Sequence, residues 1–394
     1  MCGGVIVNEM EMKDRWIYLD NAATTQMRKE AQKGMLNYLC EQYGNPGGMY
    51  RLGYESRRAV EEARETIAKT IHADCSEIYF VSGGTEADNL ALRGTMESSM
   101  ISGKHIITSS IEHSAVLNTC KYLKERGCDV TILPVDSKGR LSVDAVRKAI
   151  RPSTGLISVM MANNEIGTIQ PIEEIGELAK KEGILFHTDA VQAYAQIPID
   201  VRKLNVDLLG VSAHKFYGPK GIGFLYIRRG TKLEPQILGG GQEKGMRSGT
   251  ENVPGIIGMG EAAKYTCAEC VANGEREKKI RDTMIEKIRN EISGCVIDGS
   301  MEYRLPNNIH LCFEKIDGEM LVRLLDKDHI AVATGSACSA NKKEVSHVLT
   351  AIGKNSEQAR GSIRITLSKD TTMEDADIAV HYLKKEVDRL RKMS

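Results

Sequence analysis

One stretch, Val206-Asp-Leu-Leu-Gly-Val211-Ser-Ala-His-Lys215, carries the clearest information about the architecture. Residues 206–211 form a short, mostly apolar run of the length of a buried strand, and polar residues follow at once. Over residues 77–229 short apolar runs alternate in the same way with longer amphipathic ones. This alternation is typical of a mainly parallel sheet that is covered by helices. The sequence therefore predicts an α/β fold.

The other expected elements share these lengths and patterns. Strands are expected at residues 78–81, 105–108, 129–134, 155–162 and 184–187, and helices at residues 114–126 and 172–182. Beyond residue 260 the character changes to charged helical segments around short strands. There, helices are expected at residues 261–292 and 374–392, and strands at residues 308–313 and 362–367. These later elements indicate a second, smaller α+β domain.

The composition excludes several functional classes. The 394 residues include 53 Lys+Arg and 53 Asp+Glu, so the formal net charge is zero. A neutral balance gives no electrostatic footprint for nucleic acid or for an anionic membrane. A hydrophobic fraction of 41% supports a sizeable core and argues against a disordered or collagen-like chain. We expect a globular protein of about two domains.

The sequence shows no signal for export or for membrane insertion. It contains no run of about 18 uncharged apolar residues. Residues 1–14 mix charged side chains with short apolar stretches and do not form a signal peptide. We therefore expect a cytoplasmic protein. Its 10 cysteines are scattered, which in a reducing compartment favours free thiols, most of them small buried hydrophobes.

A glycine-rich segment, Ser82-Gly83-Gly84-Thr85, follows the first expected strand and opens a helix. In open α/β sheets, ligands bind beyond the carboxyl ends of the strands, so residues at these ends are candidates for a site. Two glycines and a hydroxyl at a helix start suit an anion held by backbone N–H groups and the helix dipole. The alternative is a plain capped turn. The Walker P-loop pattern is absent.

Three further strand ends carry polar side chains, those of His113, Asn164 and Asp189. Each has a plain structural interpretation: a structural histidine, a turn, and a carboxylate that caps the following helix. In a functional site they would orient a ligand at the sheet edge. The Asp189 carboxylate would then lie in an apolar neighbourhood and need a cationic or N–H partner.

Lys215 is the most informative residue, because it stands directly after an expected buried strand. Desolvation there favours a neutral amine, which can form a Schiff base. Pyridoxal phosphate chemistry requires such a lysine, a carboxylate for the pyridine nitrogen, and an anion pocket. Asp189 and the segment at residues 82–85 supply the other two parts. A surface lysine in a turn is the competing interpretation.

Late in the chain, Cys338 stands in a run of small residues, where a loop can move and expose the sulfur. Arg364 lies inside an apolar strand pattern and needs an anion, either a substrate carboxylate or a structural ion pair. Cys267 and Cys270 have the spacing of a redox or metal pair. They sit in a helical stretch with no second pair, which argues against a site there.

Taken together, several stretches resemble one family. They are Leu19-Asp-Asn-Ala-Ala-Thr-Thr25, Ser82-Gly-Gly-Thr-Glu-Ala-Asp-Asn-Leu90, Glu112-His113, Asn163-Asn-Glu-Ile-Gly167, Asp189-Ala-Val-Gln192, Ser212-Ala-His-Lys215, Gly218-Pro-Lys-Gly221, Arg247-Ser-Gly-Thr250 and Gly335-Ser-Ala-Cys338. From residue 18 to about residue 367, the chain resembles cysteine desulfurases of the NifS/IscS type. These are fold-type I enzymes that depend on pyridoxal 5'-phosphate, within the class V aminotransferase family.

The resemblance implies roles around the cofactor ring. Lys215 would carry the Schiff base with the cofactor. Asp189 would pair with the pyridine nitrogen, and Gln192 with the ring hydroxyl. His113 would stack on the ring and act as an acid and base.

It also implies how the phosphate of the cofactor is held. Thr85, Ser212 and His214 would bind it within one subunit. Thr250 would reach in from the partner subunit of a homodimer. No metal is expected.

For the substrate, the resemblance implies that Asn164 and Arg364 hold the carboxylate of L-cysteine. Lys215 would move a proton off the α-carbon, and Cys338, as thiolate, would attack the substrate sulfur. This would leave L-alanine and a persulfide on Cys338. The persulfide would pass to an acceptor protein, such as an iron–sulfur scaffold or a thiolation protein, with no direct role for nucleic acid or membrane.

The implied domains are a large cofactor-binding domain at residues 15–260 and a small domain formed by residues 1–14 and 261–394, which carries the mobile cysteine loop. Gln26, Gly47-Gly48 and Tyr50 depart from the usual pattern of the family. Three other functions remain open: a selenocysteine lyase, a different class V aminotransferase, and a non-enzymatic adaptor for sulfur-transfer proteins.

Overall fold

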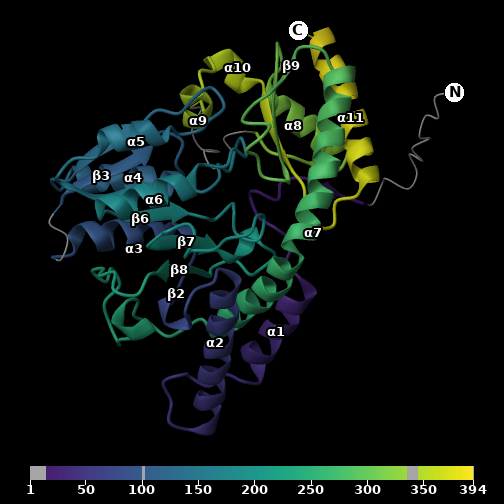
Figure 1. Ribbon diagram of the computed structural model, residues 1–394. Coiled ribbons are helices and arrows are strands. Elements are labelled where there is room, and N and C mark those ends of the chain that lie inside the picture. Colours follow the sequence, from purple (N-terminus) through teal and green to yellow (C-terminus); the bar gives the residue numbers. More distant parts are fainter. Residues whose placement is uncertain (1–14, 100–102, 335–344, 394) are drawn as a thin grey trace.

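The computed structural model describes residues 15–99, 103–334 and 345–393, and its largest element is a seven-stranded sheet (Figure 1). The strand order is β2-β8-β7-β6-β5-β3-β4, and all neighbours are parallel except β8, which is antiparallel to both β2 and β7. The strands are β2 (Ile78–Val81), β3 (His105–Ser109), β4 (Asp129–Leu133), β5 (Thr154–Ser158), β6 (Leu185–Asp189), β7 (Leu208–Ser212) and β8 (Gly223–Ile227). The predicted α/β fold with a mainly parallel sheet is confirmed.

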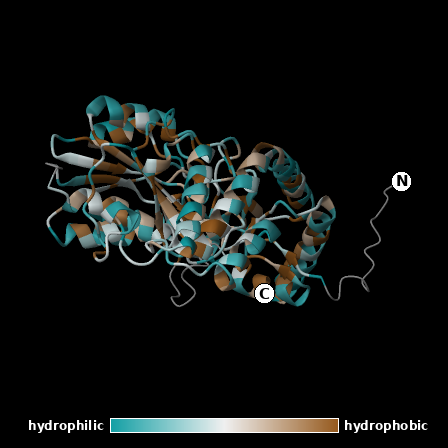
Figure 2. Ribbon diagram, turned by 90° about the horizontal axis from the view of Figure 1, so that it is seen from below, coloured by the Kyte–Doolittle hydropathy of each residue, from teal (hydrophilic) through white to brown (hydrophobic). Residues whose placement is uncertain are grey.

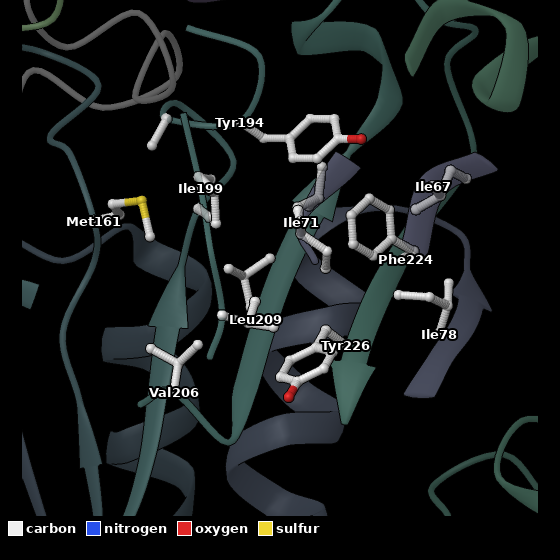
Figure 3. Packing of buried hydrophobic residues seen from close by; sticks show 14 of the residues in the cluster. Ile67, Ile71, Ile78, Met161, Tyr194, Ile199, Val206, Leu209, Phe224 and Tyr226 are labelled. Carbon is white, nitrogen blue, oxygen red and sulfur yellow. The ribbon is translucent and has the colours of Figure 1, made fainter. Parts of the chain in front are cut away.

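Helices cover both faces of this sheet, because successive strand residues point to opposite sides. Ile106 packs with α3 and α4 on one face, and its neighbour Ile107 packs with α2, α5 and α6 on the other. Figure 3 shows part of the core on the face of the sheet to which Ile107 points, around Phe224 and Tyr226. The covering helices are α2 (Arg51–Thr70), α3 (Gly84–Glu97), α4 (Ser114–Lys124), α5 (Val143–Ala149) and α6 (Ile172–Glu182).

The α6 helix shows how local sequence sets these elements. Its buried residues recur at helical spacing, and acidic residues in the first turn and lysines in the last turn complement the helix dipole. Gly183 ends the helix in the left-handed conformation, with φ of 67°. Figure 2 shows the same mixture of hydrophilic and hydrophobic residues on several helices. No helix in the described ranges is both long and apolar enough to cross a bilayer.

A second core lies beside the large sheet. It is built on an antiparallel three-stranded sheet and two amphipathic helices, and it buries Leu311, Ile363 and Leu383. Its strands are β9 (Cys295–Ile297), β10 (Asn308–Phe313) and β12 (Ser362–Thr366), and its helices are α8 (Gly318–Lys327) and α11 (Met373–Met393). The remaining elements include β1 (Ile17–Tyr18) paired with β11 (Ile330–Ala331), and the helices α1 (Lys29–Cys40), α9 (His347–Ala351) and α10 (Ser356–Arg360).

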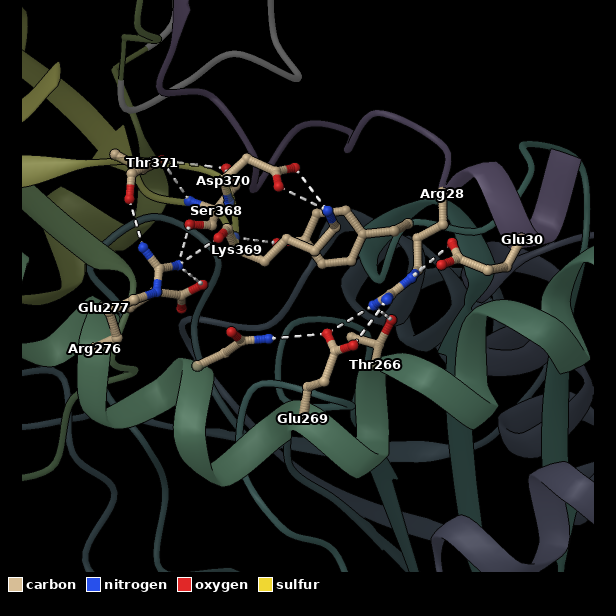
Figure 4. A network of polar contacts seen from close by, with 12 residues as sticks. Arg28, Glu30, Thr266, Glu269, Arg276, Glu277, Ser368, Lys369, Asp370 and Thr371 are labelled. Carbon is tan, nitrogen blue, oxygen red and sulfur yellow. Dashed lines mark hydrogen bonds and ion pairs between the residues drawn. The ribbon is translucent and has the colours of Figure 1, made fainter.

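The helix α7 (Val253–Glu291) connects the two cores and runs unbroken past residue 260 (Figure 1). Met259 packs in the core of the large sheet, and Met284 packs in the second core. Polar contacts fix its middle part, as Figure 4 shows. Arg28 makes two hydrogen bonds of 2.9 Å to Glu269, and Arg276 donates to backbone carbonyls that follow β12.

Candidate active site

A cavity of about 530 Å³ opens at the carboxyl ends of β6 and β7 and gathers most of the predicted site residues. Those that line it are Thr85, His113, Asn164, Asp189, Gln192, Ser212, His214, Lys215 and Arg364. Thr250 is exposed and does not line this cavity. Cys338 lies outside the described residues. A larger hollow of about 1080 Å³ between α1, α2 and α7 contains none of these predicted residues.

Lys215 ends a single turn of 3-10 helix directly after β7. Its Nζ donates hydrogen bonds to the carbonyl oxygens of Ala22 (2.6 Å) and Ala23 (2.8 Å). The side chain therefore lies in the cavity and is not a surface lysine in a turn. Gln192 donates to the same Ala22 carbonyl at 3.0 Å, which brings a second functional group beside the amine.

Asp189 is the last residue of β6 and is buried. Its Oδ1 accepts a hydrogen bond of 2.9 Å from the backbone N–H of Val191. Burial raises the pKa of this carboxyl group, while the positive charges of His113 and Lys215 oppose that shift. Residues 190–199 form turns and isolated bridges and not the helix that a capping aspartate would begin. The carboxylate is thus available for a cationic partner in the cavity.

Two histidines border the cavity. His113 is the N-cap of α4, and its Nδ1 accepts the N–H of Ala115 at 3.2 Å, so a neutral ring carries its proton on Nε2. His214 contacts Thr24 Oγ1 through Nδ1 at 3.1 Å. Burial and the positive charges of Lys215 and Lys220 lower the pKa of His214 to about 4, so this imidazole is neutral near pH 7.

The segment between β2 and α3 forms a place for an anion. Gly83 is the N-cap of α3 with φ of 154°, and no described side chain caps the helix, so the first N–H groups are available to a ligand. A Cβ at Gly84 would lie 2.7 Å from Val191 Cγ2, which explains the glycine. Glu86 accepts from Ser82 N–H and from Arg247 Nε, and these contacts fix the turn.

Arg364 combines both expected roles. Its Nη2 lies 2.7 Å from Asp20 Oδ1, and its Nη1 donates to the carbonyl oxygen of Asn164 at 2.9 Å. The structural ion pair is therefore present. However, the Nε of Arg364 is buried without a hydrogen-bond partner among the described residues, and the residue lines the cavity. One donor of the guanidinium is left for a ligand.

These residues fit pyridoxal phosphate. The cavity offers an amine, a buried carboxylate, an imidazole and a helix N-terminus, which are the groups required by an aldehyde, a ring nitrogen, an aromatic face and a phosphate. The nearest non-local atom to a Cβ at Gly83 would be Ser212 Oγ at 3.6 Å, so this turn leaves open space beside the helix N-terminus.

Sequence reasoning missed Asp88, which also lines the cavity. Its position three residues after Thr85 puts both on one face of α3, and this spacing is the signal that identifies it. Glu165, next to Asn164 in the chain, was not singled out either, and it does not line the cavity. It is buried, accepts a hydrogen bond of 2.5 Å from Ser346, and burial raises its pKa to about 7.

Two other groups of potential reactive or metal-binding residues lie outside this cavity, the pair Cys267 and Cys270 and a group around Asp298. Burial raises the pKa of Cys267 to about 11 and that of Cys270 to about 12, so both thiols are protonated and unreactive near pH 7. Asp298 groups with two other potential metal ligands. Its Oδ1 is paired with the Lys354 ammonium at 2.6 Å, so a cation is already present there.

Comparison with known proteins agrees with this geometry. The aminotransferase class-V family matches residues 17–378. The chain is 50% identical to a cysteine desulfurase IscS from Methanosarcina thermophila, covering 97% of this chain and 94% of the relative. It is also 50% identical to a cysteine desulfurase IscS from Dictyoglomus turgidum, covering 96% of each.

Solved structures give the same result. A NifS-like protein superposes with a TM-score of 0.89 at 39% identity, covering 95% of this chain and all of the other. The structure of SspA in complex with cysteine has a TM-score of 0.81 at 39% identity, covering 90% of this chain and all of the other. The chain therefore belongs to the aminotransferase class-V family and, within it, to the pyridoxal-phosphate-dependent cysteine desulfurases of the NifS/IscS type.

Proposed function

We propose that the chain transfers the sulfur of L-cysteine to its own Cys338, for delivery to an acceptor protein. The observation that carries this proposal is the placement of Lys215 and Asp189 in one cavity with His113. When bound, pyridoxal phosphate supplies an electron sink for the α-carbon of the substrate. The side chains of the cavity then have to bind and orient the cofactor and the substrate, and to transfer protons.

Each group has a proposed task. Lys215 holds the cofactor and moves a proton at the substrate α-carbon. Asp189 binds the pyridine nitrogen, and Gln192 binds the ring hydroxyl. His113 stacks on the ring, and a neutral His113 carries its proton on Nε2, because Nδ1 accepts the N–H of Ala115.

The two anionic groups, the phosphate of the cofactor and the carboxylate of the substrate, are bound by different residues. Thr85, Ser212 and His214 hold the phosphate beside the N-terminus of α3, where the neutral imidazole of His214 acts as a hydrogen-bond partner. Arg364 and Asn164 hold the substrate carboxylate. The phosphate of the cofactor and the carboxylate of the substrate thus have separate proposed binding residues.

The sulfur transfer balances as follows. The Cys338 thiolate attacks the substrate sulfur, a sulfur–sulfur bond forms, and the bond between that sulfur and the substrate Cβ breaks. The electron pair of the broken bond stays on the substrate and takes up protons, which gives L-alanine. The enzyme retains a persulfide. An iron–sulfur scaffold or a thiolation protein in the cytoplasm is the proposed acceptor.

A homodimer is proposed because Thr250 is exposed and does not line the cavity of its own chain. Leu36 and Leu39 on α1, and Tyr43 just after it, are exposed apolar side chains, which supports an interface on this part of the surface. A mixture of Lys215→Ala and Thr250→Val chains tests this. Mixed dimers restore one complete site, so activity should recover on mixing, whereas monomers or sites within one chain give no recovery.

The proposed domain division, residues 15–260 against residues 261–394 with 1–14, is supported by the two separate cores. Residues 1–14 lie outside the described ranges. The helix α7 crosses the proposed boundary, so the division describes two packing units that share one helix.

Mass spectrometry after incubation with L-cysteine tests the proposed chemistry. Extra sulfur should appear on the peptide with Cys338 in the wild type and be absent in Cys338→Ala, while the yellow colour persists. Cys312→Ala is the matched control, because Cys312 is buried and burial raises its pKa. An aminotransferase would give no sulfur adduct, and an adaptor would be colourless. A selenocysteine lyase would react with selenocysteine and leave L-cysteine unchanged.

A further inference from the structure

Two buried side chains face each other at the cavity: Asp88, which lines it, and His187, which does not. Oδ1 of Asp88 lies 3.6 Å from Nε2 of His187, and neither atom has a hydrogen-bond partner among the described residues. Their side chains are 1% and 0% exposed, so bulk water does not satisfy these atoms. Leaving two buried polar atoms unpaired costs stability, so their arrangement requires a reason.

Their position points to Asp189. His187 lies two residues before Asp189 on β6, so the two side chains share one face of the strand. Gly210 is the register partner of Asp189 on β7. A Cβ at Gly210 would lie 3.0 Å from Asp88 Oδ1 and 3.9 Å from His187 Nε2, so the glycine leaves the space where these two atoms meet.

The electrostatic surroundings favour a neutral pair. Burial raises the pKa of Asp88 well above its usual range, and the negative charge of Asp189 adds to the shift, as does Glu112 whenever it is ionised. Burial lowers the pKa of His187 to about 3. On its other side, His187 Nδ1 contacts the hydroxyl of Ser158 on β5 at 2.9 Å.

The other charged groups act mainly on Asp189. Its charged form is favoured by His113 and Lys215 from the cavity side and by the N–H of Val191. Within the described ranges, no lysine or arginine forms an ion pair with Asp88, and the basic group that faces its Oδ1 is the neutral ring of His187. Of the two aspartates, Asp189 is therefore the one that the surroundings stabilise as an anion.

We propose that Asp88 carries a proton, donates it in a hydrogen bond to His187 Nε2, and thereby acts with His187 as a neutral positioning pair behind Asp189. A small side-chain rotation closes the 3.6 Å separation. Nδ1 of His187 then carries the ring proton and donates to Ser158. The proposal rests on the proposed role of Asp189 at the pyridine nitrogen.

The consequence for the reaction is electrostatic. A second negative charge on Asp88 would repel Asp189 and make Asp189 take up a proton, which would remove its ion pair with the cofactor nitrogen. A neutral pair avoids this repulsion and still holds the Asp189 strand end by polar contact. Asp88 and His187 touch no reacting atom, so they are positioning residues.

The holoenzyme offers a direct test through the pH titration of its visible absorbance. In Asp88→Asn, the amide keeps the size of the protonated acid and a donor for His187, and it cannot ionise. The pH midpoint of the colour change should stay within about 0.3 pH unit of the wild type. In Asp88→Ala, which removes the donor, the bound cofactor should dissociate at least about tenfold faster. Asp375→Asn, a buried carboxyl in the second core, is the matched control.

A midpoint shift of about one pH unit or more in Asp88→Asn would show that Asp88 is charged in the wild type and would overturn the proposal. Cofactor loss in Asp88→Asn equal to that in Asp88→Ala would overturn the positioning role. If Asp88 had only a structural role, both substitutions would lower the melting temperature. They would change neither the pH midpoint of the colour change nor the rate of cofactor dissociation in the folded protein.

Infrared difference spectroscopy of the chain without cofactor separates this proposal from the proposed function. The carbonyl band of one protonated carboxylic acid should disappear in Asp88→Asn and remain in Asp375→Asn. An unchanged spectrum in Asp88→Asn would overturn the proposal. A wild-type protein that binds no cofactor would contradict the proposed function and leave this infrared result intact.

Discussion

The carboxylate of Asp20 lies 2.7 Å from Nη2 of Arg364, across 344 positions of sequence. This contact joins the segment after β1 to the middle of β12 at the wall of the cavity. A second hydrogen bond, from Nη1 to the carbonyl of Asn164, fixes the plane of the guanidinium. The group is thus oriented in advance, which lowers the entropy cost of binding a carboxylate.

Arg364→Ala should therefore raise the KM for L-cysteine. A hydrogen bond to a charged group contributes about 1.5 to 3 kcal/mol, so the expected increase is about ten- to a hundredfold. The colour of the bound cofactor should be unchanged. Steady-state kinetics of alanine formation measure the effect, and an unchanged KM would show that Arg364 serves only the structural ion pair.

Gly84→Ala should weaken cofactor binding. The new Cβ would meet Val191 Cγ2 at 2.7 Å, in the turn proposed to hold the phosphate, so the turn must shift. We expect at least about a tenfold loss of affinity, measured by titrating the apoprotein with pyridoxal phosphate.

Gly274→Ala is the control for that variant. Gly274 lies within α7, and the nearest non-local atoms are 3.7 Å from the place that its Cβ would take. This substitution should stabilise the helix by about 0.5 to 1 kcal/mol and leave cofactor affinity unaltered. Equal affinity losses in both variants would argue against the steric explanation.

Glu243→Ala should destabilise the protein strongly. Glu243 pairs with Arg64 at 2.8 Å, and both side chains are nearly buried. It also accepts the N–H of Phe80 at the edge strand β2. Breaking a buried pair from one side leaves a buried unpaired charge, which costs about 3 to 5 kcal/mol in the free energy of unfolding.

Arg64 supplies its own control, because it also contacts the exposed side chain of Glu61 at 3.2 Å. Glu61→Ala should change the free energy of unfolding by no more than about 1 kcal/mol. Urea denaturation measures both. Equal losses in the two variants would contradict the assignment of the buried pair.

Glu112→Gln should reduce the loss of stability that occurs as the pH rises from about 4.5 to about 8. Burial raises the pKa of Glu112 from 4.5 to about 8. The unfolded carboxyl therefore loses its proton at lower pH than the folded one. Its contribution to stability is fully present below about pH 4.5 and declines as the pH rises towards 8.

Melting temperatures between about pH 5 and pH 8 test this effect. The wild type should lose more stability over that range than Glu112→Gln, which keeps an acceptor for the N–H of Met160. Parallel pH profiles for the two proteins would contradict a protonated Glu112. The exposed variant Glu61→Gln should follow the wild type.

The local sequence pattern is sufficient to predict the bounds of a helix or strand that packs against one partner. The sequence predicts a helix at residues 172–182, and α6 has the same bounds, because apolar spacing, end charges and Gly183 all agree. The predicted start of the next long helix, residue 261, is eight residues later than its observed start at residue 253. The glycines of its first two turns hide the periodicity, and they pack closely on α1 and α2: a Cβ at Gly258 would meet Met35, and one at Gly260 would meet Ala63.

The residues of the site also fall into two groups, those that the sequence could predict and those that it could not. Lys215 and Asp189 could be located because each directly follows or ends a strand, and the carboxyl ends of neighbouring strands converge. Asp20 and Asp88 could not be assigned a role, because their partners are set by tertiary packing. Arg364 also kept two interpretations until Asp20 and the cavity were seen on either side of it.

The continuous α7 helix has a mechanical consequence. Its 39 residues extend for about 58 Å, and it is packed at one end in the core of the large sheet and at the other end in the second core. A rotation of one core against the other would have to bend this helix and break the hydrogen bonds of Arg28 and Arg276. We therefore expect the two cores to move together and the contact between Asp20 and Arg364 to be kept during turnover.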